Sequence, residues 1–455
     1  MAKTIDMTEG KPTKLLIQFA LPLVIGNLFQ QAYTLADRVI VGQFVGANAF
    51  SAVGATTALS NLFTSVCVGM SIGTGVLVSQ YYGAKDEKGV AKAIANSTYI
   101  NVLLAIITSI IALLFAEPLL RLLKTPESLM KDALAYLLVY IGGLLAVSAY
   151  YTPFSILRAL GDSKTPLIFL VFCSLLNIVL DIIFVVPLHM GVIGAAVATI
   201  LSQALAAVLC LVYAFGKVPY MRMAVTHRKI DKRMILQTLK IGLPTSAQYA
   251  LIYVSSIVLQ GVVNGFGEST IGAFTAVSQM ELLVQQIYAA LGAAMVTYTG
   301  QNIGAGKIDR VKSGVKSATM ICVVTSAILL AIFFGFGNMI MKIFVPDEEI
   351  ISISAAGIRI TSIFFMALGT VQIFRYLLSG AGDSVYSLVN GGIEIVARIG
   401  LVYLLTAIPF IGMWGIFLTT GLTWLITAVF AIVRYKGGAW KNKSLVNGVT
   451  SSAEL

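Results

Sequence analysis

Long apolar runs separated by short polar segments dominate the 455-residue chain. A helix that crosses a bilayer takes about 20 apolar residues, and each run is long enough. We predict helices because open strands cannot satisfy their backbone hydrogen bonds in lipid. The runs cover residues 15–42, 52–81, 92–116, 131–157, 166–188, 191–215, 236–264, 270–300, 313–341, 351–379, 385–409 and 412–434. The pattern therefore predicts an all-α membrane protein with twelve transmembrane helices.

Short motifs recur in the two halves at a constant offset of 221 positions. The pairs are SQYYGAK (79–85) and GQNIGAG (300–306), LRALGDS (157–163) and LSGAGDS (378–384), and GVIG (191–194) and GMWG (412–415). They indicate two homologous six-helix bundles. Because six is even, both copies enter the membrane from the same side. The sequence thus predicts a pseudo-two-fold axis along the membrane normal, with the substrate path between the bundles.

The longest polar stretch, residues 216–234, divides the chain. We predict an N-lobe over 1–215, a cytoplasmic linker over 216–234, a C-lobe over 235–435 and a cytoplasmic tail over 436–455. For the polar tail after Lys443 two alternatives stay open: it is disordered, or it is in part a cloning remnant. The first fourteen residues lack an apolar core segment, so no cleavable signal peptide is expected.

Composition excludes soluble, disordered and disulfide-scaffold proteins, because 58% of residues are apolar and only 11% are charged. The net charge of +11 is explained by the way basic residues are distributed between the two sides of the membrane. With both termini in the cytoplasm, 23 of the 31 Lys and Arg residues lie in inward segments and four in outward ones. We expect a multi-pass protein of the cell inner membrane with both termini cytoplasmic and no nucleic-acid partner.

Cysteine and histidine usage points away from zinc and redox chemistry. The four cysteines lie inside apolar runs without CxxC spacing, and the two histidines lie in predicted loops. No catalytic constellation is present, so we expect buried free thiols, no cofactor and no enzyme.

Four polar residues of the first half fall at similar membrane depth. Asp37, Asp181 and Thr199 are each eight or nine residues from a predicted outer helix end, about 12–14 Å below the surface. Asn177 lies one turn from Asp181 and shares its helix face. Such groups inside a membrane are costly and usually functional. They predict an all-oxygen cation site or a protonation site; the alternative is a set of unrelated helix-packing contacts.

The second half lacks these carboxylates. At the offset of 221, the equivalent positions are Val258, Arg398 and Val402. We predict an i, i+4 salt bridge between Glu394 and Arg398. Glu281 either meets Arg359 across the bundle or is a second coupling or substrate carboxylate. Arg375 is expected to extend its charge to the inner interface.

Proline and glycine mark two further features. Pro22 removes a backbone hydrogen bond inside the first predicted helix and permits a kink. It serves either helix packing or a hinge in the helix that carries Asp37. The Gly69-xxx-Gly73 spacing predicts close helix packing.

The chain resembles the multidrug and toxic compound extrusion (MATE) transporters over nearly its whole length. The resemblance lies in the two lobes and in matching motifs: Pro22…Gln30-xx-Tyr33-xxx-Asp37-xxxx-Gly42-xxx-Gly46, Gln80-xx-Gly83-Ala84, Gln301-xx-Gly304-Ala305, Gly161-Asp162 and Gly382-Asp383. It is most similar to the DinF-type branch. There, an acidic residue of helix 1, an Asn-xxx-Asp of helix 5 and a threonine of helix 6 form a cation site, which implies this role for Asp37, Asn177, Asp181 and Thr199.

The resemblance also implies a hinge role for Pro22. The NorM-type branch places its coupling acids in helices 7 and 10. Here the seventh predicted helix has no acid and the tenth has only arginines. This difference argues against a NorM-type coupling site in the C-lobe.

The leading hypothesis is a cation-coupled antiporter that exports amphipathic, often cationic, small molecules in exchange for H⁺ or Na⁺ and works as a monomer in the lipid bilayer. Gln30, Tyr33 and Glu281 are candidates to line its cavity. The alternative is a flippase for lipid-linked saccharides, which would need extra helices or a strongly cationic cavity. The two-lobed repeat disfavours a channel or receptor.

Overall fold

The computed structural model describes residues 4–446, and every regular element in this range is helical. The bounds are α1 (Pro12–Phe44), α2 (Ala47–Gly83), α3 (Glu87–Leu122), α4 (Glu127–Gly142), α5 (Leu144–Ala159), α6 (Lys164–Val185), α7 (Gly191–Lys217), α8 (Pro219–Thr226), α9 (Lys232–Val263), α10 (Glu268–Gly304), α11 (Ile308–Met341), α12 (Glu348–Ser362), α13 (Phe365–Gly380), α14 (Val385–Thr406) and α15 (Trp414–Lys436). Two short 3₁₀ turns, Asn264–Phe266 and Ala439–Asn442, complete the described range.

Ten of the helices in residues 4–446 are long and apolar enough to span a membrane, and two bent pairs bring the possible total to twelve. The prediction of an all-helical membrane protein is thus confirmed. The bent pairs are α4 with α5, at 48°, and α12 with α13, at 50°. At the first break, a side chain on Gly143 would overlap Ile200, so glycine lets α7 approach the bend.

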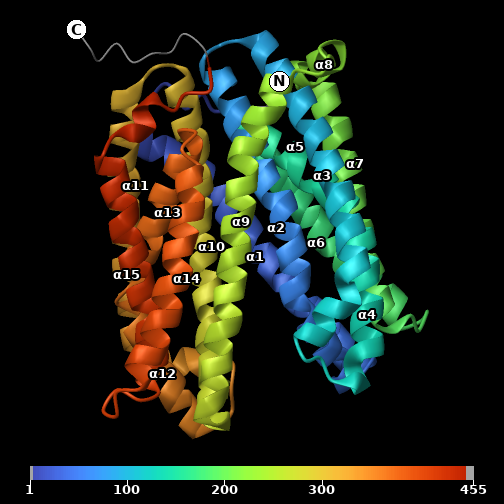
Figure 1. Cartoon of the computed structure of the whole chain (residues 1–455), viewed down its shortest axis with the longest axis vertical. Helices are drawn as coiled ribbons and strands as arrows, with labels where there is room; N and C mark the ends of the chain where they lie inside the picture. The colour runs from blue at the N-terminus through green and yellow to red at the C-terminus, as the bar shows by residue number, and fades with distance from the viewer. Residues whose placement is uncertain (1–3, 447–455) are drawn as a thin grey trace.

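The helices form two bundles, α1–α8 and α9–α15, that meet near the chain ends and diverge away from them (Figure 1). We call the end with both termini the terminal face. The 221-residue offset relates helix boundaries as well as motifs: α2 ends at Gly83 and α10 at Gly304, while α5 ends at Ala159 and α13 at Gly380. The duplicated architecture therefore extends to the positions at which helices stop.

The bundles contact each other mainly through their first two long helices. α2 packs along α9 and α10, and α1 packs against α10 and α11. A side chain on Gly69 would overlap Ser246, and one on Gly73 would overlap the backbone of Thr238 and Gly242. The Gly69-xxx-Gly73 spacing thus marks the close α2–α9 contact that small residues permit.

The segment between the bundles is short and attached to the first bundle. It contains α8, and the Asn96 side chain donates to the Lys229 carbonyl at 3.3 Å and accepts from the Asp231 amide at 2.8 Å. His189 and His227 lie outside the helices, as predicted. The four cysteines are buried free thiols, also as predicted.

The alternative of a disordered tail after Lys443 is wrong for the part of the tail that the structure describes. Leu445 is only 8% exposed and packs with apolar side chains of the first bundle. At the other end of the chain, Met7 is fully buried among residues from α1 and the second bundle. Residues 447–455 of the predicted tail lie outside the described range.

Candidate functional site

The four polar residues predicted at one depth gather on three neighbouring helices of the first bundle. Asp37 comes from α1, Asn177 and Asp181 from α6 and Thr199 from α7, and α6 packs against both other helices. The carboxyl groups of Asp37 and Asp181 lie close enough to interact electrostatically. The amide of Asn177 donates to the Thr199 hydroxyl at 3.5 Å, and this hydroxyl donates to the Ala195 carbonyl at 3.1 Å.

The site is buried and rich in unsatisfied oxygen atoms. Asp181 and Asn177 have no exposed surface and Asp37 is 8% exposed. One carboxylate oxygen of Asp37, both of Asp181 and the amide oxygen of Asn177 have no hydrogen-bond partner. Buried polar atoms without partners are rare and costly, and a bound cation or proton would remove much of that cost. This donor set consists of oxygen atoms alone, which suits a hard cation.

Of the tyrosines near this site, Tyr33 was named from the sequence as a cavity candidate, whereas those that α4 contributes were not predicted. Tyr136 of α4 lies near both carboxyl groups, and its ring stacks on that of Tyr140 at 6.3 Å. Tyr140 shares a 2.9 Å hydrogen bond with Thr64 of α2. The i, i+4 spacing of the two tyrosines in an apolar run was the available signal, because it places two polar tips on one helix face.

The predicted cavity residues of α1 border the same region. Gln30 and Tyr33 are both half-buried. The side chain of Gln30 contacts the Tyr151 hydroxyl of α5, and Tyr33 lies near Asp37. Pro22 is buried within α1, which remains a continuous helix from Pro12 to Phe44.

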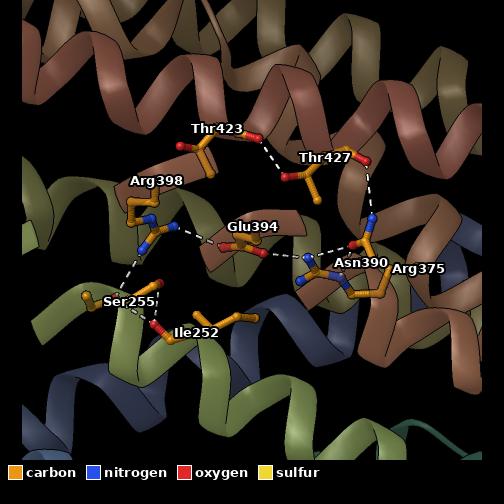
Figure 2. A network of polar contacts seen from close by, with 9 residues as sticks. Ile252, Ser255, Arg375, Asn390, Glu394, Arg398, Thr423 and Thr427 are labelled. Atoms are coloured by element: carbon orange, nitrogen blue, oxygen red, sulfur yellow. Dashed lines mark hydrogen bonds and ion pairs between the residues drawn. The ribbon is translucent and has the colours of Figure 1, made fainter. Parts of the chain in front are cut away.

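The second bundle contains a buried charge network in place of an unpaired carboxylate pair (Figure 2). Glu394 accepts from Arg398 at 2.9 Å, which confirms the predicted salt bridge, and from Arg375 at 2.7 Å. Arg375 also donates twice to the Asn390 oxygen, at 3.1 and 2.9 Å. Arg398 donates to the Ser256 hydroxyl at 3.2 Å, which ties α14 to α9.

The expected interfacial placement of Arg375 is therefore wrong. Its side chain is 9% exposed and lies inside the bundle, between α13 and α14. Hydropathy places the residue close to a helix end, and a long cation at that position often extends to the interface. The partners that keep it inside, Asn390 and Glu394, are on another helix, where local sequence spacing cannot connect them to it.

Glu281 does not meet Arg359. Its carboxyl group lies near Thr361 and Arg398, whereas Arg359 donates to Asn338 at 3.1 Å. Glu394, Arg375 and Arg398 together carry one excess positive charge when ionised. An ionised Glu281 would balance that charge within this network. Among residues 4–446, no ion pair includes Asp37 or Asp181, so the carboxyl pair of the first bundle is the better candidate for a cation site.

Comparisons with known proteins fit this architecture. The MatE family model matches residues 22–183 and 244–404, one segment in each bundle. The probable multidrug resistance protein YpnP of Bacillus subtilis (strain 168) is 29% identical, covering 97% of this chain and 99% of its own. A crystal structure of MATE in complex with MaL6 superposes with a TM-score of 0.91 at 22% identity, covering 97% of this chain and 100% of that one. A multidrug resistance MATE family transporter of the MOP superfamily in its outward-facing conformation gives 0.90 at 22% identity, with 97% and 99% covered.

Proposed function

The chain belongs to the MatE, or MATE, family of transporters, and from this premise we propose that it exports amphipathic, often cationic, small molecules from the cell in exchange for H⁺ or Na⁺. The curated relatives support export of drugs: besides the Bacillus protein, they include the multidrug export protein MepA of Staphylococcus saprophyticus. Membership of a transporter family also places the chain outside the enzymes.

The observation that carries the proposal is the unpaired carboxyl pair, Asp37 and Asp181. H⁺ or Na⁺ entering from outside binds there with oxygen atoms of Asn177 and Thr199, and removes the cost of two buried, facing negative charges. Two carboxyl groups this close titrate as a pair, so one bound cation per cycle is sufficient for coupling. This arrangement supports a place in the DinF-type branch.

Helix α1 connects ion binding to movement of the bundles. It carries Asp37, and it packs against α6 within its own bundle and against α10 and α11 of the other. A change in the position of α1 on cation binding therefore reaches the boundary between the bundles. Pro22 leaves the Gln18 carbonyl without its intrahelical donor, which makes this part of the helix easier to bend.

The substrate binds between the bundles, beside Gln30 and Tyr33, with Glu281 on the opposite wall. Aromatic faces attract organic cations, and the tyrosines around Asp37 offer such faces. Glu281 adds a half-buried carboxyl group. Substrate and coupling ion then compete for a region of negative potential, which explains why ion entry favours drug release.

A flippase for lipid-linked saccharides fits less well. Such a substrate carries a pyrophosphate, which calls for free cationic groups. The two buried arginines of the second bundle, Arg375 and Arg398, already pair with Glu394. We also propose that the terminal face is cytoplasmic, because the basic residues concentrate there, and that one chain suffices, because both walls of the path belong to it.

The test is transport by the purified protein in proteoliposomes, with ethidium as the probe. An inward H⁺ or Na⁺ gradient should drive ethidium in the opposite direction, and the gradient that works identifies the ion. An ionophore that dissipates this gradient should stop uphill movement. Uphill movement without any gradient, or no movement under either, would contradict the proposal. Asp309→Asn, at an exposed carboxylate at the start of α11, is the matched control for loss of one negative charge.

A further inference from the structure

Two buried glutamines span the boundary between the bundles at the terminal face. Gln80 of α2 donates its amide hydrogen to the Gly380 carbonyl at 2.9 Å, and Gln301 of α10 donates to the Ala159 carbonyl at 2.8 Å. Gly380 and Ala159 are the last residues of α13 and α5, where helix carbonyls lack an intrahelical partner. Each glutamine therefore completes the end of a helix in the opposite bundle.

The same two side chains hold the two ends of the polypeptide. The Leu445 amide donates to the Gln80 oxygen at 2.8 Å, and the Met7 amide donates to the Gln301 oxygen at 2.9 Å. Both glutamines have no exposed surface, so donor and acceptor are each used once in a site without bulk water. The offset of 221 relates the glutamines and the helix ends, so the arrangement is a symmetric pair.

The terminal segments cross over to the bundles to which they are not directly joined. We call residues 4–10 the N-strap and residues 443–446 the C-strap. Met7 of the N-strap packs in a cluster formed mainly by the second bundle, and Leu445 of the C-strap packs in one formed mainly by the first. The Met7 carbonyl accepts from Asn302 of the second bundle at 3.0 Å, whereas the Leu445 carbonyl accepts at 2.8 Å from Gln237 of α9, in its own bundle. The crossing of the C-strap therefore rests on the Leu445 side chain and on its amide bond to Gln80.

The helix ends leave no room for larger residues beside the glutamines. A side chain on Gly83 would overlap the Gln301 carbonyl, and one on Gly304 would overlap that of Gln80. This tight contact lies where the bundles join, whereas they diverge at the other end (Figure 1). A transporter that alternates its access must separate the bundles at the terminal face, so these hydrogen bonds must be exchanged for bonds to water.

We propose that Gln80 and Gln301 are the paired gate residues of the cytoplasmic side, and that the two straps latch this gate by crossing between the bundles. The inference rests on the proposed function in one respect: the gate closes a transport path. Opening toward the cytoplasm then requires release of two helix ends and two straps. Residues 4–10 and 443–446 are then working parts of the transport cycle, and the repeated Gln-xx-Gly motif encodes the gate.

A cysteine introduced by Thr299→Cys is buried while the gate is closed, so its reactivity measures opening of the gate. Thr299 has no exposed surface, lies beside Gly380, and its hydroxyl has no hydrogen-bond partner to lose. The reaction rate of Thr299→Cys with N-ethylmaleimide, corrected for protein that has only the native thiols, therefore measures exposure at the gate. Gln80→Leu and Gln301→Leu should each raise this rate about 25-fold, the effect of two net hydrogen bonds of typical strength.

Two truncations test the C-strap separately. A chain that stops after Ser444 loses Leu445 and its bond to Gln80, whereas a chain that stops after Val446 keeps both. The shorter chain should raise Thr299→Cys labelling about fivefold or more and lower ethidium turnover, and the longer one should match the full-length protein. Equal labelling in all three proteins would overturn the role of the C-strap.

A reversible cross-link separates a gate from a permanent structural contact. A β-carbon on Gly300 would lie 3.0 Å from that of Ser79, so cysteines at these positions can form a disulfide between the bundles once the helices move apart by about 0.5–1 Å, to the separation that a disulfide needs. Oxidised Ser79→Cys/Gly300→Cys protein should lose transport, and a reducing agent should restore it. Full transport by the oxidised protein would show that this contact persists throughout the cycle and would refute the gate.

The labelling of Thr299→Cys with N-ethylmaleimide tests the gate without the need for a transported substrate. If ethidium is not transported, the proposed function fails while Thr299→Cys can still respond to the straps and glutamines. If ethidium is transported but labelling stays unchanged in the glutamine variants and the short truncation, the gate fails alone. Should Gln80→Leu not fold, the truncation pair and Gln301→Leu supply the same readout.

Discussion

At the scale of the residue, two carboxyl groups with no basic partner face each other inside the first bundle. None of the ion pairs among residues 4–446 includes Asp37 or Asp181. In the second bundle, Glu394 lies between two arginines. Buried carboxyl groups thus lie in two environments: one compensates the negative charge with arginines, and the other offers no ion pair among the described residues.

Replacement of either N-lobe carboxylate tests whether its charge is needed for cation-coupled transport. Asp37→Asn and Asp181→Asn keep the side-chain volume but remove the charge that the cation meets. We expect each to lower gradient-driven ethidium transport by at least about tenfold, while membrane insertion and thermal stability are retained. Proteoliposome flux at equal protein density is the measurement, with Asp309→Asn as the control. Wild-type flux in Asp37→Asn would refute the N-lobe coupling site.

Loss of the Glu394 charge should instead act on stability. Glu394→Gln leaves Arg375 and Arg398 buried without their shared counter-charge, and breaking such a group costs about 3–5 kcal/mol. Thermal unfolding followed by size-exclusion chromatography should show a large fall in Tm. Transport per folded molecule should stay within about twofold of wild type, since neither arginine contacts the coupling site.

Glu127→Gln is the control for this prediction. Glu127 pairs with Arg121 at 2.7 Å, but both side chains are largely exposed, so its loss should cost less than about 1 kcal/mol. Equal losses of stability in the two variants would show that burial does not govern the Glu394 network.

At the scale of the element, hydropathy predicted the spans well because the bilayer requires long apolar helices wherever the chain crosses it. The depth of Asp37, Asn177, Asp181 and Thr199 could be counted from helix ends, so their proximity was predictable. The internal bends of two spans were not, because they depend on which helix packs against the break, as Ile200 does at Gly143.

Contacts between distant segments account for the other differences. Arg375 is held by residues of another helix, and Met7 and Leu445 are buried only because the opposite bundles receive them. A short polar terminal sequence contains no local signal of such a partner. The functional use of the Gln-xx-Gly repeats likewise depends on helix ends that lie far from them along the chain, on α5 and α13.

A substitution in α1 tests whether its flexibility matters to coupling. Pro22→Ala supplies the N–H that the Gln18 carbonyl lacks and stabilises the straight helix, by up to about 3 kcal/mol. We expect expression and Tm to be retained or raised, with ethidium turnover reduced about threefold or more. Pro244→Ala, in α9, is the matched control because that helix carries no coupling acid. Equal reductions in both variants would contradict a hinge specific to the ion-site helix.

At the scale of the whole molecule, the distribution of basic residues gives the orientation that the proposals require. Val225→Cys in the segment between the bundles and Phe410→Cys between α14 and α15 place reactive thiols at opposite ends of the molecule. These positions are 53% and 86% exposed, whereas no native cysteine is more than 4% exposed. An impermeant maleimide should label only Phe410→Cys in intact cells, and label Val225→Cys after lysis. Labelling of Val225→Cys only from outside would invert the topology.

The offset of 221 residues also preserves a history of divergence after duplication. Both halves have the glutamine, its glycine neighbour and the helix end opposite, because a symmetric contact between two equivalent bundles needs each of them twice, once on each side of its axis. The position of Asn177, by contrast, is occupied by Arg398 in the other copy, and that of Asp181 by Val402. If the two proposals hold, the contacts that open are present in both halves, while the ion-binding carboxyl pair belongs to one half alone.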